Sequence, residues 1–318
     1  MRGDQRRLNF YDISTKTNKS GLPISPSIID VIRGLRHAHS KGIARLEIDR
    51  KTKVLSIVDI QDIGSNTIIY LMNADKSAPD VRFSNEITGS SRMGNKTDQE
   101  SRDFGAHLVI SHSPNLPGRF LCVLEKNTGL SRDLARRLIQ ATLKNLYKTE
   151  PQFYTAPDPS GARDNNNNPK KINYRPMIEF LGYPSDTFIQ QLNTGKLLEV
   201  QLIHSEKNQP LGGTPWLEKE ESILRLKPDR AKIKNVTGVW NGVKVALNQY
   251  SSNYENARIR FHSTVTNKDE TVMVSALNGA LLDDRFVKSR LITGINPRLP
   301  ECLEGISTPF AQKIIQLM

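Results

Sequence analysis

Cationic side chains crowd into one stretch of this 318-residue chain, between residues 224 and 262. The first part of the stretch, residues 224–244, contains one acid, Asp229, and six cations: Arg225, Lys227, Arg230, Lys232, Lys234 and Lys244. Lysine and arginine at this density are typical of a surface that neutralises the phosphates of a nucleic acid. The alternative interpretation is a solvated basic face that contacts no ligand.

A short strand is predicted at the end of this stretch, over residues 257–262. Because side chains alternate along a strand, Arg258, Arg260 and His262 should point one way, with Ile259 and Phe261 on the opposite face. Two residues of strand rise about 6.5–7 Å, a spacing that suits contacts with successive phosphates. We therefore predict a DNA-binding site made of seven residues: Lys227, Arg230, Lys232, Lys234, Lys244, Arg258 and Arg260.

The composition of the whole chain agrees with a polyanionic partner. Lys and Arg number 45 and Asp and Glu number 33, which gives a formal net charge of +12. A charge of this size favours association with nucleic acid or an anionic membrane face. Aromatic residues make up only 6% of the chain, so there is little material for stacking single-stranded bases. Duplex DNA held by its backbone is the better prediction.

Residues that could support catalysis are sparse, and no enzyme activity, metal or cofactor is predicted. A metal-dependent nuclease needs carboxylates around one ion, and the nearest set is Glu179, Asp186 and Glu199, with Gln201 where a lysine would be wanted. A nuclease effector of a defence system therefore stays as an alternative. Another alternative is a protein-interaction subunit whose basic face binds an acidic partner.

The two cysteines, Cys122 and Cys302, show neither metal-ligand spacing nor a disulfide framework, which indicates a reducing compartment. No apolar run approaches the length of a membrane span, and the first residues have no secretory pattern. We expect a soluble, cytoplasmic protein.

The elements that must position the cations predict an α+β fold of mixed domains, with antiparallel sheets and packed helices. Residues 25–39 and 131–147 have the apolar spacing of helices, and Ser25 and Ser131 stand where N-caps are expected. Three strand-like runs of a meander follow the first helix: residues 43–49, 54–60 and 67–73.

Two polar segments interrupt this pattern. Residues 75–105 predict a long loop that is functional or disordered. Residues 151–171 contain an asparagine run and several prolines, and we interpret them as a linker. The predicted domains are an N-terminal α+β domain over 1–150 and a C-terminal α+β domain over 172–318, which carries the basic stretch.

Two blocks of sequence carry a resemblance to a known family. Residues 117–125, followed by Gly129, Arg132 and Leu138, form an apolar strand, a turn and a helix. Residues 226–236 contain a Lys-Pro segment that leads into basic residues, and residues 257–260 and 267–270 supply a later basic strand and its turn. In this order of elements the chain resembles the RexA-like family of phage exclusion proteins. The DNA-binding subunit of the Kiwa defence pair is a looser analogue.

The resemblance implies a two-domain α+β protein that forms a homodimer and binds double-stranded DNA with little sequence preference. It further implies a role in phage exclusion or abortive-infection defence. In that role the protein would sense phage DNA or protein–DNA complexes and signal to a membrane partner encoded nearby. The chain is longer than the family pattern, mainly at residues 75–105 and in the Asn-rich segment.

Overall fold

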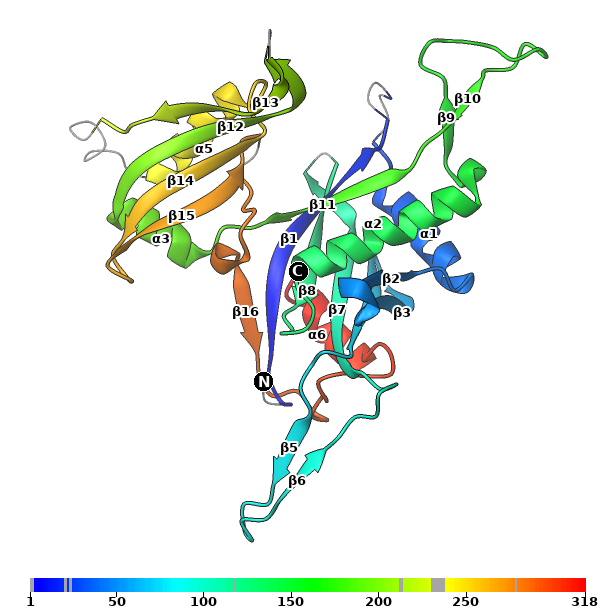
Figure 1. The fold of residues 1–318 in the computed structure, drawn as a ribbon, viewed down its shortest axis with the longest axis vertical. Helices are drawn as coiled ribbons and strands as arrows, with labels where there is room; N and C mark the ends of the chain where they lie inside the picture. Colours follow the sequence, from blue (N-terminus) through cyan, green and yellow to red (C-terminus); the bar gives the residue numbers. More distant parts are fainter. Residues whose placement is uncertain are drawn as a thin grey trace. The chain divides into compact units, whose positions relative to one another are not determined.

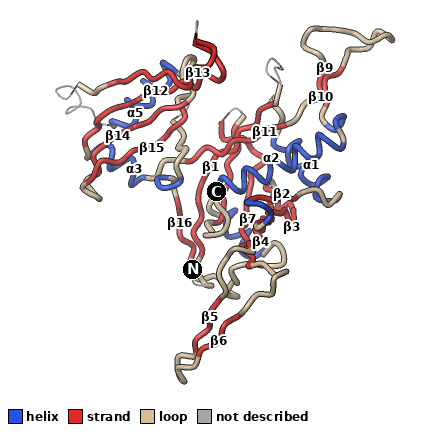
Figure 2. The backbone as a smooth tube through the Cα atoms, in the orientation of Figure 1, coloured by secondary structure: helices blue, strands red, loops and turns tan. Residues whose placement is uncertain are grey.

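The computed structural model describes residues 3–19, 22, 25–116, 118–211, 214–229, 238–277 and 279–318. The fold is mixed α+β with antiparallel sheets, as predicted, and strands form most of its regular structure (Figure 2). None of the helices within the described ranges has the length and apolar character needed to cross a membrane.

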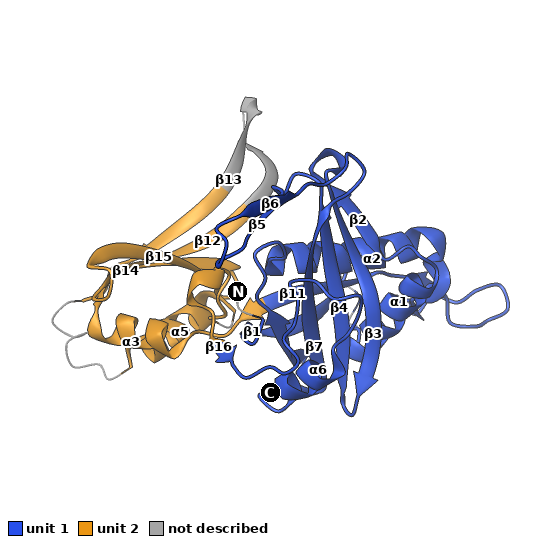
Figure 3. Ribbon diagram, turned by 90° about the horizontal axis from the view of Figure 1, so that it is seen from below, with its two compact units in different colours: residues 1–180, 290–318 blue, residues 181–289 orange. Residues whose placement is uncertain are grey.

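The chain forms two compact units, but their boundaries differ from the predicted domains. Unit 1 comprises residues 1–180 and 290–318, and unit 2 comprises residues 181–289 (Figure 3). The sequence-based division placed a linker at 151–171 and gave the whole remainder to one domain. The structure corrects this, because the C-terminal strand β16 (Ser289–Ile292) returns to pair with β1 (Arg6–Thr17).

Unit 1 is built on an eight-stranded sheet in the order β11-β1-β8-β7-β4-β3-β2, with β16 also paired to β1 (Figure 1). Its remaining strands have the following bounds: β2 (Arg45–Ile48), β3 (Lys53–Ile63), β4 (Asn66–Asp75), β7 (Arg102–Leu116), β8 (Arg119–Glu125) and β11 (Pro176–Gly182). The central strands carry runs of buried apolar residues on both faces, as in β4, because both faces of this sheet are covered.

Helices α1 (Ile28–Ser40) and α2 (Arg132–Thr149) pack together over one face of the sheet (Figure 1). Both predicted helices are confirmed, although the N-cap of α1 is Ser27 and not Ser25: the Ser27 side chain accepts from the backbone N–H of Asp30. Ser131 caps α2 in the same way, as predicted. On the opposite face α6 (Thr308–Ile315) packs against β7, where Phe310 contacts the ring of His107.

Two hairpins stand where the sequence predicted a loop and a linker. Strands β5 (Val81–Ser84) and β6 (Ser91–Gly94) pair within the polar segment 75–105. Strands β9 (Thr155–Pro157) and β10 (Lys171–Asn173) pair across the Asn-rich segment, after the short 3₁₀ turn η2 (Pro151–Phe153). Both hairpins belong to unit 1.

Unit 2 is a four-stranded antiparallel sheet in the order β13-β12-β14-β15. Its strands are β12 (Lys196–Leu211), β13 (Thr214–Leu226), β14 (Asn256–Ser263) and β15 (Lys268–Ser275). Helices α3 (Asp186–Thr194) and α5 (Val239–Tyr250) lie on one side of this sheet (Figure 3). Phe188 of α3 forms the centre of the core, with ring contacts to Trp240, Phe261 and Phe286 at 5.2–5.7 Å between centroids.

Candidate nucleic-acid interface

Strand β14 has the predicted alternation of side chains. Ala257, Ile259 and Phe261 are fully buried against the helices, whereas Arg258, Arg260 and His262 alternate with them. Within the described residues of unit 2 no helix packs on the side that carries the arginines. We call this side the open face of the unit 2 sheet, defined by Arg225, Arg258 and Arg260.

The three arginines of the open face come from strands separated by β12. Gln201 of β12 lies opposite both Arg225 of β13 and Arg258 of β14. The backbones at Arg225 and Arg258 are therefore two strand spacings, about 9–10 Å, apart. Such a group of guanidinium groups can donate hydrogen bonds to neighbouring phosphate oxygens.

The arginines of the open face already have polar partners. Arg258 Nη1 donates to Gln201 Oε1 at 3.1 Å, so its partner is neutral. Arg260 Nη2 lies 2.9 Å from Asp269 Oδ2, and Arg225 Nε lies 3.9 Å from Glu199 Oε1. Hydrogen bonds from His262 and then from Arg260 lower the pKa of Asp269 below its ordinary 3.8, so this carboxylate is ionised at neutral pH. Two of the three cations on this face are thus partly neutralised.

The remaining predicted residues do not gather on the open face. Lys244 is exposed on α5, in the layer on the other side of the sheet, with Nζ 6.0 Å from the centre of the Trp240 ring. Lys227 is exposed just after the end of β13. Arg230, Lys232 and Lys234 lie outside the described residues. The structure thus places Arg258 and Arg260 together and separates Lys244 from them.

The excess positive charge of the chain lies mainly in the other unit. Unit 2 has 14 Lys and Arg against 12 Asp and Glu, whereas unit 1 has 31 against 21. Unit 1 therefore carries most of the long-range attraction for an anion. This charge is spread over the unit, so the densest local run of cations in the sequence does not indicate it.

A basic surface of unit 1 was missed for this reason. Helix α2 exposes Arg137, Lys144 and Lys148, which are spaced by seven and four residues and so share one side of the helix. Arg50 is exposed in the turn between β2 and β3. We call these four residues the α2–β2 surface. The sequence signal that could have identified this surface is the helical spacing of cations opposite the apolar stripe.

The turn that holds Arg50 has an uncommon backbone. Asp49, Arg50 and Lys51 have φ values of +50°, +55° and +69°, in the left-handed region. For residues with a Cβ this conformation costs roughly 1–2 kcal/mol each. Lys53 Nζ bonds Asp49 Oδ2 at 2.8 Å, and Thr52 Oγ1 donates to the carbonyl of Asp49 at 2.8 Å, which holds the turn. The same lysine lowers the pKa of Asp49.

The residues of the alternative nuclease site are not brought together. Glu179 lies on β11 in unit 1, where it pairs with Lys16 at 2.9 Å. In unit 2, Asp186 begins helix α3, whereas Glu199 lies on β12 beside Arg225. Within the ranges that the structure describes, no group of three or more His, Cys, Asp or Glu side chains is placed to hold a metal ion.

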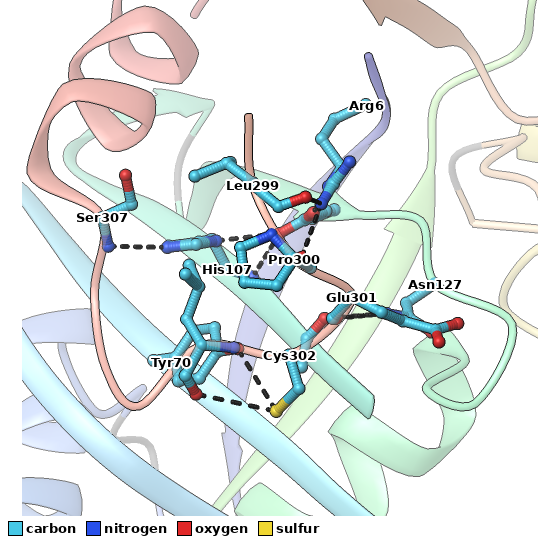
Figure 4. Close-up of polar contacts among 12 residues, drawn as sticks. Arg6, Tyr70, His107, Asn127, Leu299, Pro300, Glu301, Cys302 and Ser307 are labelled. Carbon is cyan, nitrogen blue, oxygen red and sulfur yellow. Dashed lines mark hydrogen bonds and ion pairs between the residues drawn. The ribbon is translucent and has the colours of Figure 1, made fainter. Parts of the chain in front are cut away.

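A buried polar cluster lies between β1, β7, β8 and the C-terminal segment of unit 1 (Figure 4). Arg6 Nε lies 2.8 Å from Glu125 Oε1, and His107 Nδ1 lies 2.8 Å from Glu125 Oε2. The backbone N–H of Ser307 donates to His107 Nε2 at 3.0 Å, which leaves the ring proton on Nδ1 to donate to Glu125. Arg6 also donates to the carbonyls of Leu299 and Pro300.

Tyr70 and Cys302 extend the cluster. Tyr70 Oη accepts from the backbone N–H of Leu303 at 2.6 Å and lies 3.7 Å from Cys302 Sγ (Figure 4). Burial is the main cause that raises the pKa of the Tyr70 hydroxyl and of the Cys302 thiol, so both groups keep their protons at neutral pH. These contacts attach the C-terminal segment to the sheet. They explain its place in unit 1 without a catalytic role.

Comparison with known proteins gives no relative for this chain: no protein-family model, no curated protein and no solved structure matches it.

Proposed function

We propose that this chain binds double-stranded DNA through the sugar-phosphate backbone with little sequence preference. The observation that supports the proposal is the open face of the unit 2 sheet, where Arg225, Arg258 and Arg260 lie on a surface that no described helix of unit 2 covers. The net charge of +12 adds a long-range attraction for a polyanion.

Asp269 does not prevent phosphate binding at Arg260. The side chains of Arg260 and Asp269 are 53% and 43% exposed, and exposed ion pairs contribute only about 0–1 kcal/mol. A phosphate can therefore replace Asp269 as the partner of Arg260 at little cost. Arg258 faces a neutral amide, so its charge is available for a phosphate without displacing an acid.

The resemblance to the RexA-like family extends this proposal to phage exclusion. In this role a homodimer of the chain binds phage DNA in the cytoplasm and signals to a separate membrane protein. The direct readout is a change in membrane potential on phage infection when the chain and the neighbouring membrane protein are expressed together. If the chain binds DNA but causes no such change, the DNA-binding proposal stands and the proposed role in phage exclusion is wrong.

The test of DNA binding is fluorescence anisotropy with a random duplex of about 30 bp and its single strand, over a salt series. We expect the duplex to bind more tightly, with a steep fall in affinity as salt increases. Replacing Arg258 and Arg260 by Gln should reduce the slope of log K against log salt by about 2. Lys268→Gln combined with Lys171→Gln, neither of them on the open face, is the matched control.

An unchanged slope in the Arg258/Arg260 variant would overturn the assignment of the open face. Absence of binding to either nucleic acid at physiological salt would overturn the function and would favour an acidic protein partner.

A further inference from the structure

We infer that the α2–β2 surface of unit 1, made of Arg50, Arg137, Lys144 and Lys148, is a second binding site for the backbone of duplex DNA. The inference rests on the proposed function, since it names a further contact of the same ligand. It is carried by different residues in a different unit, so it can fail while the proposed function holds.

Helix α2 presents its cations in one row. Six residues of the helix are buried: Ala135, Leu138, Ile139, Thr142, Leu143 and Leu146. Arg137, Lys144 and Lys148 stand away from them and are exposed. At a rise of 1.5 Å per residue, the row extends about 16 Å along the helix, which suits an extended anion better than a single small one.

Strand β2 lies along the same helix and adds Arg50. The side-chain amide of Asn145 donates to the carbonyl of Ile43 at 3.4 Å, next to the start of β2. At the other end of β2, the charge of Arg137 contributes to the lowered pKa of Asp49. The hydrogen bond from Asn145 and the packing of α2 against β2 place this strand beside the helix (Figure 1). The electrostatic effect of Arg137 on Asp49 agrees with the turn of Arg50 lying toward the Arg137 end of the row.

The acids around this surface already have other polar partners. Asp49 bonds Lys53 at 2.8 Å, Asp133 bonds Arg136 at 2.6 Å, and Glu47 lies 3.2 Å from Arg45. Glu150, at the end of α2, bonds His37 at 2.9 Å. Within the described residues, Arg50, Arg137, Lys144 and Lys148 have no carboxylate within 4.0 Å. This surface therefore retains its charge, unlike the open face of unit 2.

The chemistry of the surface favours nucleic acid over a membrane. A helix that lies in a membrane interface needs large apolar side chains on its exposed side. None of the exposed large hydrophobic residues among those described belongs to α2 or β2. A cationic surface without apolar anchors is instead suited to phosphates that stay in water.

The test uses the full chain with Arg137, Lys144 and Lys148 all replaced by Gln. Duplex affinity at about 0.1 M salt should fall on the order of tenfold or more, and the slope of log K against log salt should decrease by about 3. Arg82 and Arg92 of the β5–β6 hairpin and Lys126 after β8 are exposed and lie outside this surface, so replacing these three by Gln removes equal charge from unit 1 as the control. Lys144→Arg with Lys148→Arg should retain binding.

The outcomes separate the two proposals. If the wild-type chain binds no duplex, the proposed function fails, and this site fails with it. If the wild type binds and the α2 variant shows the same affinity and slope as the control, only the α2–β2 surface is excluded. If the α2 variant keeps duplex binding but loses binding to vesicles with about 30% anionic lipid, the surface binds membranes and the inference is wrong.

Discussion

Nδ1 of His107 lies 2.8 Å from Oε2 of Glu125, and the other carboxylate oxygen of Glu125 lies 2.8 Å from Arg6. Both acid and guanidinium are more than nine-tenths buried. One carboxylate thus compensates a buried cation and orients a buried imidazole. The carboxylate therefore also supports the C-terminal segment, because Arg6 and His107 both bind backbone groups of that segment.

Replacing Glu125 by Gln should therefore reduce the free energy of unfolding by about 3–5 kcal/mol, because it removes the carboxylate charge 2.8 Å from the buried guanidinium of Arg6. Urea denaturation measures this. The control is Glu179→Gln, which breaks an exposed pair with Lys16 and should cost less than about 1 kcal/mol. Equal costs for the two variants would contradict the buried cluster.

Replacing Asp269 by Asn should strengthen duplex binding. The substitution removes a negative charge from the open face and releases Arg260 from its partner. We expect a several-fold gain in affinity at low salt that disappears as salt screens the charges. The control is Asp98→Asn, which removes one exposed acid elsewhere. An affinity that does not change, or that decreases, would argue that phosphates do not approach Arg260.

Substitutions at Lys51 test the left-handed turn between β2 and β3. With φ at +69°, glycine should be tolerated better than any residue that has a Cβ. We expect Lys51→Gly to be more stable than Lys51→Ala by about 1 kcal/mol, measured by thermal or urea unfolding. Both variants lose the same side chain, so the comparison isolates the backbone. A more stable alanine variant would show that the turn is not left-handed at this residue.

The two thiols should resist alkylation for the same physical reason. Burial raises the pKa of Cys122 and of Cys302, and the thiolate is the reactive form. With iodoacetamide in the native state, Cys302 should react slowly and faster as pH rises above 9, its ordinary value. Cys122, which is fully buried, should react only after denaturation. Rapid labelling of Cys122 at neutral pH would contradict its position in the sheet.

Asp62 should make stability depend on pH in the acid range. The hydrogen bond from Arg36 is the main cause that lowers its pKa below 3.8 in the folded chain, with help from Thr67. Its stabilising effect is therefore complete above the unfolded value of 3.8 and is lost as pH falls through the lower folded value. The difference in unfolding free energy between wild type and Asp62→Asn should shrink as pH falls below 3.8. If this free-energy difference instead grew as pH falls, the pKa of Asp62 would be raised in the folded chain and the prediction would be wrong.

Local patterns in the sequence predicted the elements that depend on local physics. The period of two over residues 257–262 gave the orientation of Arg258 and Arg260, and Ser131 marked the start of α2. The hairpins β5–β6 and β9–β10 were missed because their stability comes from backbone pairing and turn residues, while their apolar content is low. The left-handed backbone of Asp49, Arg50 and Lys51 was not predicted, because three successive left-handed residues without glycine have no sequence signature.

The features of the fold that local sequence patterns did not predict depend on contacts between residues that are distant in sequence. The pairing of β16 with β1 joins segments almost 300 residues apart, and no periodicity in either segment indicates the partner. The cluster of Arg6, His107 and Glu125 has the same origin. The candidate site was only partly predictable, because a run of cations in sequence does not show which of them share a face or which already have acids beside them.

The strand that leaves unit 1 and the strand that returns to it, β11 and β16, both pair with β1. Unit 2 is therefore an insertion whose two ends are held on one strand of the host sheet. During synthesis, all of unit 2 leaves the ribosome before the residues that complete unit 1, namely β16 and α6. Unit 2 can thus fold while unit 1 still lacks β16 and the helix that covers one face of its sheet, so unit 1 reaches its native packing only after residues 290–318 have been synthesised.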